Sequence, residues 1–337
     1  MRIALDAMGS DTCPQADVAG GVLAARELGH TVLLVGDEQQ IKVELSRLNA
    51  AGLPIEIVHA EQQVLMTDTP AKAGKEKSRS SMHVGMELVN SGMAEAFVTA
   101  GNTGAALAIA TLHTLRRIPG VKRPALSGIY PMRGHKIVVL DLGANADSRP
   151  EWLVQFAAMG SIYARRALGI ASPRVGLLSN GEEEGKGNAA IKEATAVLRA
   201  SRLNFVGNVE PKEVVRGEID VVVSDGFVGN IFLKTFEASA SYLTETIRGE
   251  VTSDALSMLG GLLLRPAFRR VRRRMDTGEV GGAPLLGVNG VVIIGHGRSD
   301  ALAVKNAVRQ AALAVEGRVI EMIREEFQDS QNVPGES

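Results

Sequence analysis

Short apolar runs alternate with helix-like segments along most of this chain, and this alternation constrains the fold more than any other feature. The apolar runs are uninterrupted, which is typical of strands buried on both faces of a parallel sheet. Helix-like segments connect the runs, as in repeated βαβ units. The sequence therefore predicts an α/β fold with a largely parallel sheet and helices on both faces. The predicted strands are residues 3–7, 31–35, 55–58, 96–100, 137–142, 174–178, 221–224 and 291–295, and the predicted helices include 16–28, 102–117, 151–168 and 188–200.

Composition excludes several classes of protein. The hydrophobic share of 45% and the charged share of 22% are ordinary for a soluble globular protein, and 337 residues suffice for a large core. A net charge of −1 gives no support for nucleic-acid binding. The single cysteine excludes an internal disulfide, and no apolar stretch approaches the ~20 residues that span a bilayer. The N-terminus enters a strand-like run directly rather than a signal peptide, so we expect a cytoplasmic protein.

Six of the predicted strands end in small and polar residues. Ligands of open α/β sheets bind beyond the carboxyl ends of the strands, so we expect these six ends to share one cleft. The alternative for each end is a tight turn with a helix cap, and Asn102 and Thr103 could simply cap the helix that follows them. The strand ends are residues 6–11, 99–104, 141–145, 179–181, 225–230 and 295–298.

The loop after the strand at 174–178 combines glycines with charge. Lys186 lies between Gly185 and Gly187 and follows the acidic run 182–184. Glycines let backbone amides approach a ligand closely, and a lysine there can meet a phosphate or a developing negative charge. The alternative is a solvated lysine that pairs with Glu184. We place the chemistry of the chain in this loop.

Cofactor and metal motifs are weak or missing. Residues 185–190 formally satisfy GxGxxA, but three preceding glutamates would repel a pyrophosphate. The sequence has no GxxxxGK[ST] loop and no cysteine pair or close histidine pair suited to zinc. We therefore predict neither a cofactor nor a metal. His296 lies in a Gly-His-Gly turn at a strand end, where a ligand-binding or proton-transfer role is expected.

One region, residues 239–275, breaks the alternation and is mostly helical by pattern. We expect a single domain over 1–327 that includes this amphipathic insertion, followed by a disordered tail at 328–337. Pro266 is expected to break or kink the insertion. The arginines have three interpretations: a solvated helix face, a surface for anionic lipid, or a dock for an acidic protein. The predicted contact residues are Leu262, Leu263, Leu264, Arg265, Arg269, Arg270 and Arg273.

Several long motifs occur in one order along the chain. They are 5–9 (LDAMG), 99–105 (TAGNTGA), 141–145 (DLGAN), 181–188 (GEEEGKGN), 225–230 (DGFVGN) and 295–297 (GHG). Together they resemble the bacterial phosphate acyltransferase family, the acyl-acyl-carrier-protein:phosphate acyltransferases of phospholipid synthesis. The resemblance covers residues 1–319. Ser10 stands where a second glycine is expected, and Thr12 and Cys13 replace a more usual His-Ala.

The resemblance implies a fold like that of phosphotransacetylases and isopropylmalate dehydrogenases, in a homodimer. It implies that acyl carrier protein thioester and inorganic phosphate become acyl phosphate and free carrier protein. A downstream membrane enzyme, an acyl-phosphate:glycerol-3-phosphate acyltransferase, then uses the product. The helical insertion is expected to pair across the dimer as a bundle whose tip touches an anionic membrane. This places the protein in the cytoplasm, peripherally associated with the inner face of the cell membrane.

The residues fit this reaction without a covalent enzyme intermediate, because phosphate is already a nucleophile. Lys186 is predicted to stabilise charge on the carbonyl oxygen or the departing sulfur, and Asn230 to donate to the same oxyanion. His296 is predicted to complete the pocket as the third catalytic residue. The predicted substrate- and phosphate-binding residues are Asn102, Thr103, Gly104, Asp141, Asn145, Gly185 and Gly187.

Three alternatives remain at this point. A decarboxylating dehydrogenase would need arginines in the cleft for substrate carboxylates and an aspartate cluster for a metal, whereas these strand ends offer asparagines, glycines and one histidine. A phosphotransacetylase that uses acyl-coenzyme A has closer chemistry but no obvious need for the Leu/Arg insertion. A non-catalytic peripheral membrane scaffold has no need for so many polar strand ends.

Overall fold

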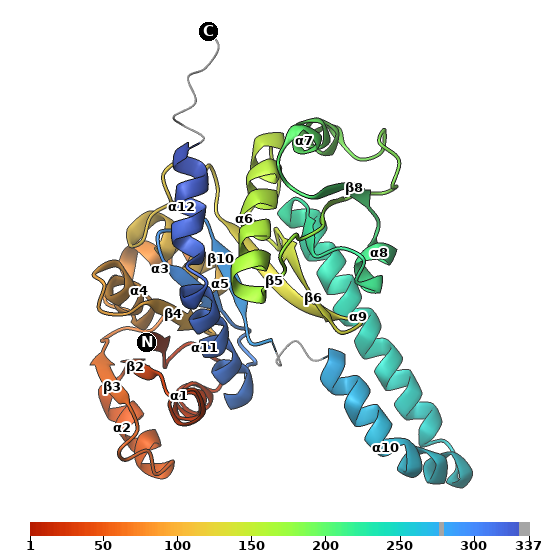
Figure 1. Ribbon diagram of the computed structural model, residues 1–337. Coiled ribbons are helices and arrows are strands. Elements are labelled where there is room, and N and C mark those ends of the chain that lie inside the picture. The colour runs from red at the N-terminus through yellow and green to blue at the C-terminus, as the bar shows by residue number, and fades with distance from the viewer. Residues whose placement is uncertain (276–279, 330–337) are drawn as a thin grey trace.

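A single mixed sheet forms the centre of the molecule in the computed structural model, which describes residues 1–275 and 280–329 (Figure 1). The described part contains 11 strands in this sheet, in the order β3-β2-β1-β4-β11-β10-β5-β6-β9-β7-β8. The strands are β1 (Arg2–Asp6), β2 (Thr31–Gly36), β3 (Ile55–His59), β4 (Ala96–Thr99), β5 (Ala125–Met132), β6 (His135–Leu140), β7 (Val175–Leu178), β8 (Phe205–Val209), β9 (Val221–Val223), β10 (Ala283–Leu286) and β11 (Val291–Ile294).

Helices occupy both faces of the sheet, as the α/β pattern predicts. They are α1 (Gln15–Leu28), α2 (Glu38–Arg47), α3 (Pro70–Glu76), α4 (Ser81–Asn90), α5 (Thr103–Ala108), α6 (Pro150–Leu168), α7 (Ala189–Ala200), α8 (Pro211–Arg216), α9 (Gly226–Val251), α10 (Ala255–Met275), α11 (Ala301–Glu316) and α12 (Val319–Asp329), with a π-helical turn, η1 (Ile109–His113), after α5. Residues 328 and 329 of the predicted tail end α12, and the rest of that tail lies outside the described residues.

The sheet is largely parallel, but its middle is not. The pairs β11–β10, β10–β5 and β5–β6 are antiparallel, and the other pairs are parallel. Three successive reversals make the β6-β9-β7-β8 half run opposite to the β1-β4-β11 half. The predicted fold class is therefore confirmed, while the carboxyl ends of the two halves do not share one edge of the sheet.

Three strands were not predicted: β5, β8 and β10. Proline cannot donate to a strand ladder, so Pro131 in β5 and Pro284 in β10 mask the strand pattern. Pairing between strands outweighs the local preference of proline, because Pro284 pairs with Ile293 of β11 inside the sheet. These two central strands carry the reversal of direction, and they also carry residues of the site.

The two faces of the sheet are packed differently. Ile3 and Leu5 point into one continuous core that spans both halves of the sheet under α1, α6, α7 and α11. On the opposite face, alternate strand residues divide into two separate clusters. Ala4 belongs to the cluster under α4 and α5, and Val139 belongs to the cluster beside α8 and α9. The two separate clusters on this opposite face leave a gap over β5 and β10, and a cavity forms in that gap.

The helical insertion is a protruding hairpin of α9 and α10 (Figure 1). It begins at Gly226, well before the predicted start at residue 239, because the first turns of α9 belong to the α/β body. Pro266 does not break α10, which continues to Met275. Within the described residues, neither these two helices nor any other is both long and apolar enough to cross a membrane.

Candidate active site

A cavity of about 480 Å³ lies between the two smaller clusters and draws on both halves of the sheet. The loops after β4, β6 and β11, the first turns of α9 and the inner faces of β5 and β10 form its walls. Four of the six predicted strand ends contribute; the ends at 6–11 and 179–181 do not line it. Its lining includes Thr103, Gly104, Leu126, Tyr130, Leu142, Gly143, Ala144, Asn230, Leu233, Lys234, Glu237, Leu285, Ile294, Gly295, His296 and Ser299.

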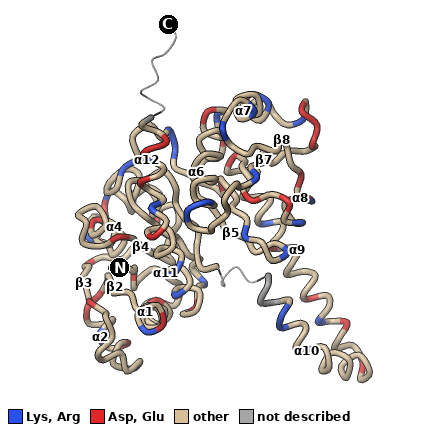
Figure 2. The backbone as a smooth tube through the Cα atoms, in the orientation of Figure 1, with Lys and Arg blue, Asp and Glu red and all other residues tan. Residues whose placement is uncertain are grey.

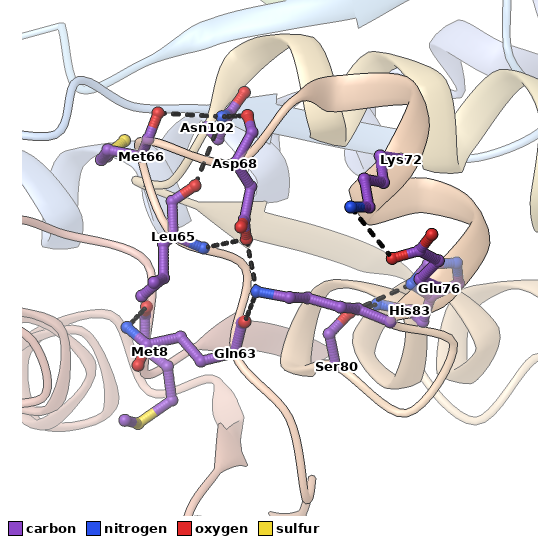
Figure 3. A network of polar contacts seen from close by, with 11 residues as sticks. Met8, Gln63, Leu65, Met66, Asp68, Lys72, Glu76, Ser80, His83 and Asn102 are labelled. Carbon is purple, nitrogen blue, oxygen red and sulfur yellow. Dashed lines mark hydrogen bonds and ion pairs between the residues drawn. The ribbon is translucent and has the colours of Figure 1, made fainter.

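Asn102 fixes the wall that follows β4. Its Oδ1 accepts the NH of Ala105 at 3.0 Å and so caps α5. Its Nδ2 donates to the carbonyl oxygens of Leu65 (3.4 Å), Met66 (3.2 Å) and Asp68 (3.1 Å), as Figure 3 shows. The Asn102 side chain is therefore engaged with protein, while Thr103 and Gly104 line the cavity. The NH groups of these two residues are the first of α5 and have no intrahelical acceptor.

Lys77 holds the segment that binds Asn102. Its Nζ donates to the Asp68 carboxylate at 2.5 Å and to the Gln63 carbonyl at 2.9 Å. The same Asp68 oxygen accepts the NH of Leu65 at 2.7 Å. The Lys77 ammonium, with that NH, lowers the pKa of Asp68 below its usual range. Lys77 and Asp68 thus close the turn whose carbonyls orient Asn102.

The loop after β6 is organised by a buried carboxylate, Asp141. It accepts the backbone NH groups of Leu126, Gly143, Ala144 and Asn145 at 2.7–3.3 Å, and the Asn145 Nδ2 at 2.8 Å. Burial raises the pKa of Asp141, and these hydrogen bonds oppose the rise. The Asn145 Nδ2 also donates to the carbonyl of Pro124. Neither side chain lines the cavity; together they present Gly143 and Ala144 to it.

Asn230 reaches the cavity from the first turns of α9. Asp225 caps this helix by accepting the NH of Val228 at 2.8 Å. A Cβ atom at Gly229 would lie 2.1 Å from the carbonyl oxygen of Asp141, so only glycine lets α9 approach the β6 loop this closely. The exposed Asn230 side chain lies across from Gly143. Helix α9 thus carries an amide donor to the rim of the cavity.

His296 lies in the turn after β11, and its hydrogen bonding defines its tautomer. Its Nδ1 accepts the NH of Arg298 at 3.1 Å. A neutral imidazole that accepts at Nδ1 carries its proton on Nε2, so Nε2–H is available as a donor. The strand end after β1 supports the turn, because the NH of Asp11 donates to the carbonyl of Gly297 at 2.8 Å. This gives the 6–11 segment a structural role behind the cavity wall.

Lys186 is exposed and does not line the cavity in this structure. Its loop is held through the backbone: the Asn208 Nδ2 donates to the carbonyls of Glu183 (3.1 Å) and Lys186 (3.3 Å), and the NH of Gly187 donates to Asn180. Gly185 and Gly187 lie in the same exposed loop, away from the cavity lining.

Two of the three glutamates before Lys186 pair with other cations. Glu182 bonds Lys212 at 2.6 Å, and Glu184 bonds Arg199 at 3.3 Å. The predicted alternative, a Lys186–Glu184 pair, is therefore not formed. Glu182, Glu210 and Glu213 bring carboxylate oxygens within 4.8 Å of one another, but the Lys212 ammonium lies 2.6–3.6 Å from all three. A resident lysine thus already neutralises this acidic cluster.

The predicted contact residues on α10 are accessible to solvent. Leu262, Leu263 and Leu264 are 63%, 75% and 53% exposed. Arg265, Arg269 and Arg270 are exposed as well, on the part of α10 that returns toward the α/β body (Figure 2). The side chain of Arg273 lies outside the described residues.

Sequence reasoning missed several residues of the cavity, among them Tyr130, Leu233, Lys234 and Ser299. Lys234 had a signal, because it lies four residues after Asn230 and so shares its helix face. Its Nζ bonds Glu237, another lining residue, at 2.9 Å. Tyr130 had none, because its strand was not predicted.

Solved structures share the fold of this chain. The EutD phosphotransacetylase from Staphylococcus aureus aligns with a TM-score of 0.59 at 17% identity, covering 94% of each chain. A phosphotransacetylase from Streptococcus pyogenes gives a TM-score of 0.59 at 16% identity, covering 95% of this chain and 94% of that chain. This likeness agrees with the fold expected from the sequence.

Sequence comparison gives the family. The model of the "Fatty acid synthesis protein" family matches residues 1–322. The phosphate acyltransferase of Pelotomaculum thermopropionicum is 48% identical over 324 residues, covering 96% of this chain and 94% of that protein. That of Citrifermentans bemidjiense is 45% identical over 331 residues, covering 97% and 94%. The chain therefore belongs to the bacterial phosphate acyltransferase family, and it is an acyltransferase enzyme of fatty acid and phospholipid synthesis.

Proposed function

We propose that this enzyme transfers a fatty acyl group from acyl carrier protein to inorganic phosphate, giving acyl phosphate and free carrier protein. One observation carries the proposal: Thr103, Asn230 and His296 converge from three different segments, the start of α5, the start of α9 and the turn after β11, on a single cavity whose remaining wall is mostly apolar. Such a cavity offers hydrogen-bond donors to phosphate and to a carbonyl oxygen, and an apolar surface to an acyl group.

The phosphate lies against the wall after β4 in this proposal. The hydroxyl of Thr103, the backbone NH groups of Thr103 and Gly104, and the Nε2–H of His296 are its donors. Asn102 acts by positioning this wall, because its own amide hydrogens already bond three carbonyls. Asp141 and Asn145 act in the same indirect way by shaping the loop that faces Asn230.

A phosphate oxygen then attacks the thioester carbon, and the carbon–sulfur bond breaks as the new carbon–oxygen bond is completed. Asn230 donates to the oxygen that becomes negative, and the released thiolate takes up the proton that the attacking phosphate loses. Lys186 stabilises the charge on that oxygen or on the sulfur. Since Lys186 lies outside the cavity lining, its loop must close toward the cavity when the acyl donor binds.

The α9–α10 hairpin supports a further part of the proposal, contact with an anionic membrane and with a second copy of the chain. Its exposed leucines offer apolar area, and Arg265, Arg269 and Arg270 offer positive charge to lipid or to the acidic carrier protein. The enzyme would then be a homodimer, peripherally attached to the inner face of the membrane. A membrane enzyme that acylates glycerol 3-phosphate would consume the product there.

Thiol release from palmitoyl-acyl carrier protein tests the reaction, measured with and without inorganic phosphate and with hydroxylamine to trap acyl phosphate. The proposal predicts phosphate-dependent release and an acyl hydroxamate. Release from acyl-coenzyme A but not from the carrier protein would instead make the enzyme a phosphotransacetylase. No release from either donor would refute the proposed reaction.

Flotation with anionic vesicles tests the membrane contact. Replacing Leu262, Leu263 and Leu264 together with serine should release the protein from vesicles and leave turnover in solution unchanged. Val43→Ser, at an apolar side chain that is 52% exposed on α2, is the matched control and should leave vesicle binding intact. Loss of turnover in solution with unchanged flotation would contradict this division of roles.

A further inference from the structure

We infer that the acyl chain of the substrate runs from the cavity into an apolar seam between α9 and the strands β5 and β6. This seam determines which acyl-chain lengths the enzyme prefers. The inference deepens the proposed function and rests on it. The residues of the seam are Tyr130, Met132, Ile137, Val139, Leu142, Phe232, Leu233 and Phe236.

The seam adjoins the cavity. Tyr130, Leu142 and Leu233 line both spaces, so movement of these three side chains would join the two. The donors Thr103 and His296 belong to the cavity and not to the seam. An acyl donor whose carbonyl lies near these donors would therefore direct its alkyl end toward the seam.

The chemistry of the seam suits an alkyl chain and excludes a polar ligand. Every side chain that lines it is a hydrocarbon or a thioether, apart from the hydroxyl of Tyr130. The strand residues Ile137 and Val139 are 0% and 1% exposed and form its floor. Phosphate or a charged carrier group would lose its hydration there without gaining a hydrogen-bond partner.

Tyr130 lies at the junction of the two spaces. A Cβ atom at Gly128, a residue of the cavity wall, would come within 2.6 Å of the Tyr130 ring, 2.7 Å of its hydroxyl oxygen and 2.5 Å of Leu142 Cδ1. The glycine thus lets the tyrosine fold back along β5 over the cavity floor. The ring of Tyr130 faces both spaces and forms the threshold between them.

The seam is nearly closed, with a volume of about 10 Å³, so the chain must displace side chains to enter. The strand side of the seam is fully packed, but Phe232, Leu233 and Phe236 on α9 are only partly buried. These three side chains are therefore the ones that move when the acyl chain enters. Each methylene that the seam takes up from water should improve kcat/KM about fourfold, until the seam is filled.

Chain-length profiles test the inference, using octanoyl, dodecanoyl and palmitoyl thioesters of the same carrier protein. Phe232→Trp places a larger side chain in the seam, at a residue that does not line the cavity, and should lower kcat/KM for the palmitoyl donor by about tenfold or more, because an alkyl chain gains several-fold per methylene taken up. The octanoyl donor should change little, since its short chain does not enter the seam. Ile231→Trp is the matched control, because Ile231 is 50% exposed on the same helix and lines neither space.

A second variant guards against a folding defect at the first. Phe236→Ala enlarges the far end of the seam, and it should shift the preference toward longer chains or weaken the palmitoyl donor alone. A palmitoyl donor with a terminal diazirine should cross-link to peptides of β5, β6 or α9 in the wild-type enzyme.

The outcomes separate the inference from the proposed function. Phosphate-dependent release that is equal for all donors, or that Phe232→Trp lowers equally for all donors, would overturn the acyl seam and leave the proposed reaction standing. Cross-links confined to the α10 surface would do the same. A wild-type enzyme that releases thiol from no donor would overturn both.

Discussion

The loops after β4 and after β7 both combine glycines, asparagine and polar residues, yet the structure uses them in opposite ways. Asn102 in the first loop makes four hydrogen bonds to protein. Lys186 in the second is exposed, and Glu182 and Glu184 near it pair with other cations. The comparison distinguishes a binding wall that is fixed before substrate arrives from a charged group that has to be brought to it.

Under the proposed mechanism, this difference between the two loops has a consequence for catalysis. A fixed wall holds phosphate in position for attack, which reduces the entropy lost on the way to the transition state. A lysine that arrives with the acyl donor acts mainly when charge develops. The two loops should therefore respond differently to mutation, one in binding and stability and the other in turnover.

The largest effect is expected from Lys186→Ala. Loss of a group that stabilises developing charge should lower kcat on the order of 100- to 1,000-fold. The melting temperature should hardly change, because an exposed side chain outside any ion pair of the described residues contributes little to stability. Lys192→Ala on α7, also exposed, is the control. Turnover close to wild type in Lys186→Ala would remove this residue from the mechanism.

Asp141→Ala should show the reverse pattern, a loss of stability. The variant removes the shared acceptor of five donors. The Asn145 Nδ2 keeps the Pro124 carbonyl and the exposed Gly143 NH can bond water, whereas each remaining donor costs about 1–3 kcal/mol when it finds no substitute. We expect a drop of roughly 3 kcal/mol in the free energy of unfolding, measured by urea denaturation. An unchanged denaturation midpoint would show that the loop does not depend on this carboxylate.

Lys77→Met should weaken the β4 wall without touching the cavity. The turn at residues 65–68 loses its ammonium donor, so Asn102 is less well oriented. The expected result is a KM for phosphate about tenfold higher, equivalent to roughly 1.4 kcal/mol of binding, with kcat largely kept. Lys77→Arg keeps the charge and should restore part of the loss. A lower kcat at unchanged KM would argue against a positioning role for Lys77.

The smallest predicted effect concerns the pH dependence of stability. Asp17 is buried beside Ser10, whose hydroxyl donates to it at 2.7 Å, and burial raises the pKa of Asp17 to about 7. The unfolded carboxyl is already ionised near neutral pH, whereas the folded one still binds a proton below pH ~7. Unfolding therefore releases a proton, and stability should fall by about 1.4 kcal/mol between roughly pH 6 and pH 8.

Asp17→Asn carries no titrating proton at this position and should lack that part of the fall. Thermal melts of both proteins across this pH range provide the measurement, and their difference removes the contribution of the histidines. Parallel pH profiles for the two proteins would show that Asp17 does not titrate in this range.

The sequence predicts the fold class because buried strands leave uninterrupted apolar runs, as at residues 31–35 and 221–224. It does not show the reversal of direction in the middle of the sheet. Pro131 and Pro284 mask the two strands that produce the reversal, and only tertiary pairing overrides their local preference. Tyr130, which depends on one of those strands, was missed for the same reason.

The residue types of the candidate site could be predicted from the sequence, but their hydrogen-bond and ion-pair partners could not. Strand-end glycine and asparagine signalled Asn102 and Asn145, and the structure shows both amides bonded to protein carbonyls or carboxylate. The contacts of Asn102 come from residues 65–68, far from it in sequence. Likewise, the neighbours of Lys186 suggested a pair with Glu184, whereas Arg199 on α7 takes that carboxylate. Long-range contacts of this kind leave no mark in a local motif.

Phosphate saturation curves with palmitoyl-acyl carrier protein test the central distinction between the two loops most directly. The wild-type enzyme, Thr103→Val and Lys186→Ala would be compared at a saturating concentration of the acyl donor. We predict that Thr103→Val raises the KM for phosphate with kcat largely kept, and that Lys186→Ala lowers kcat with that KM largely kept. The same parameter changing in both variants would contradict the account.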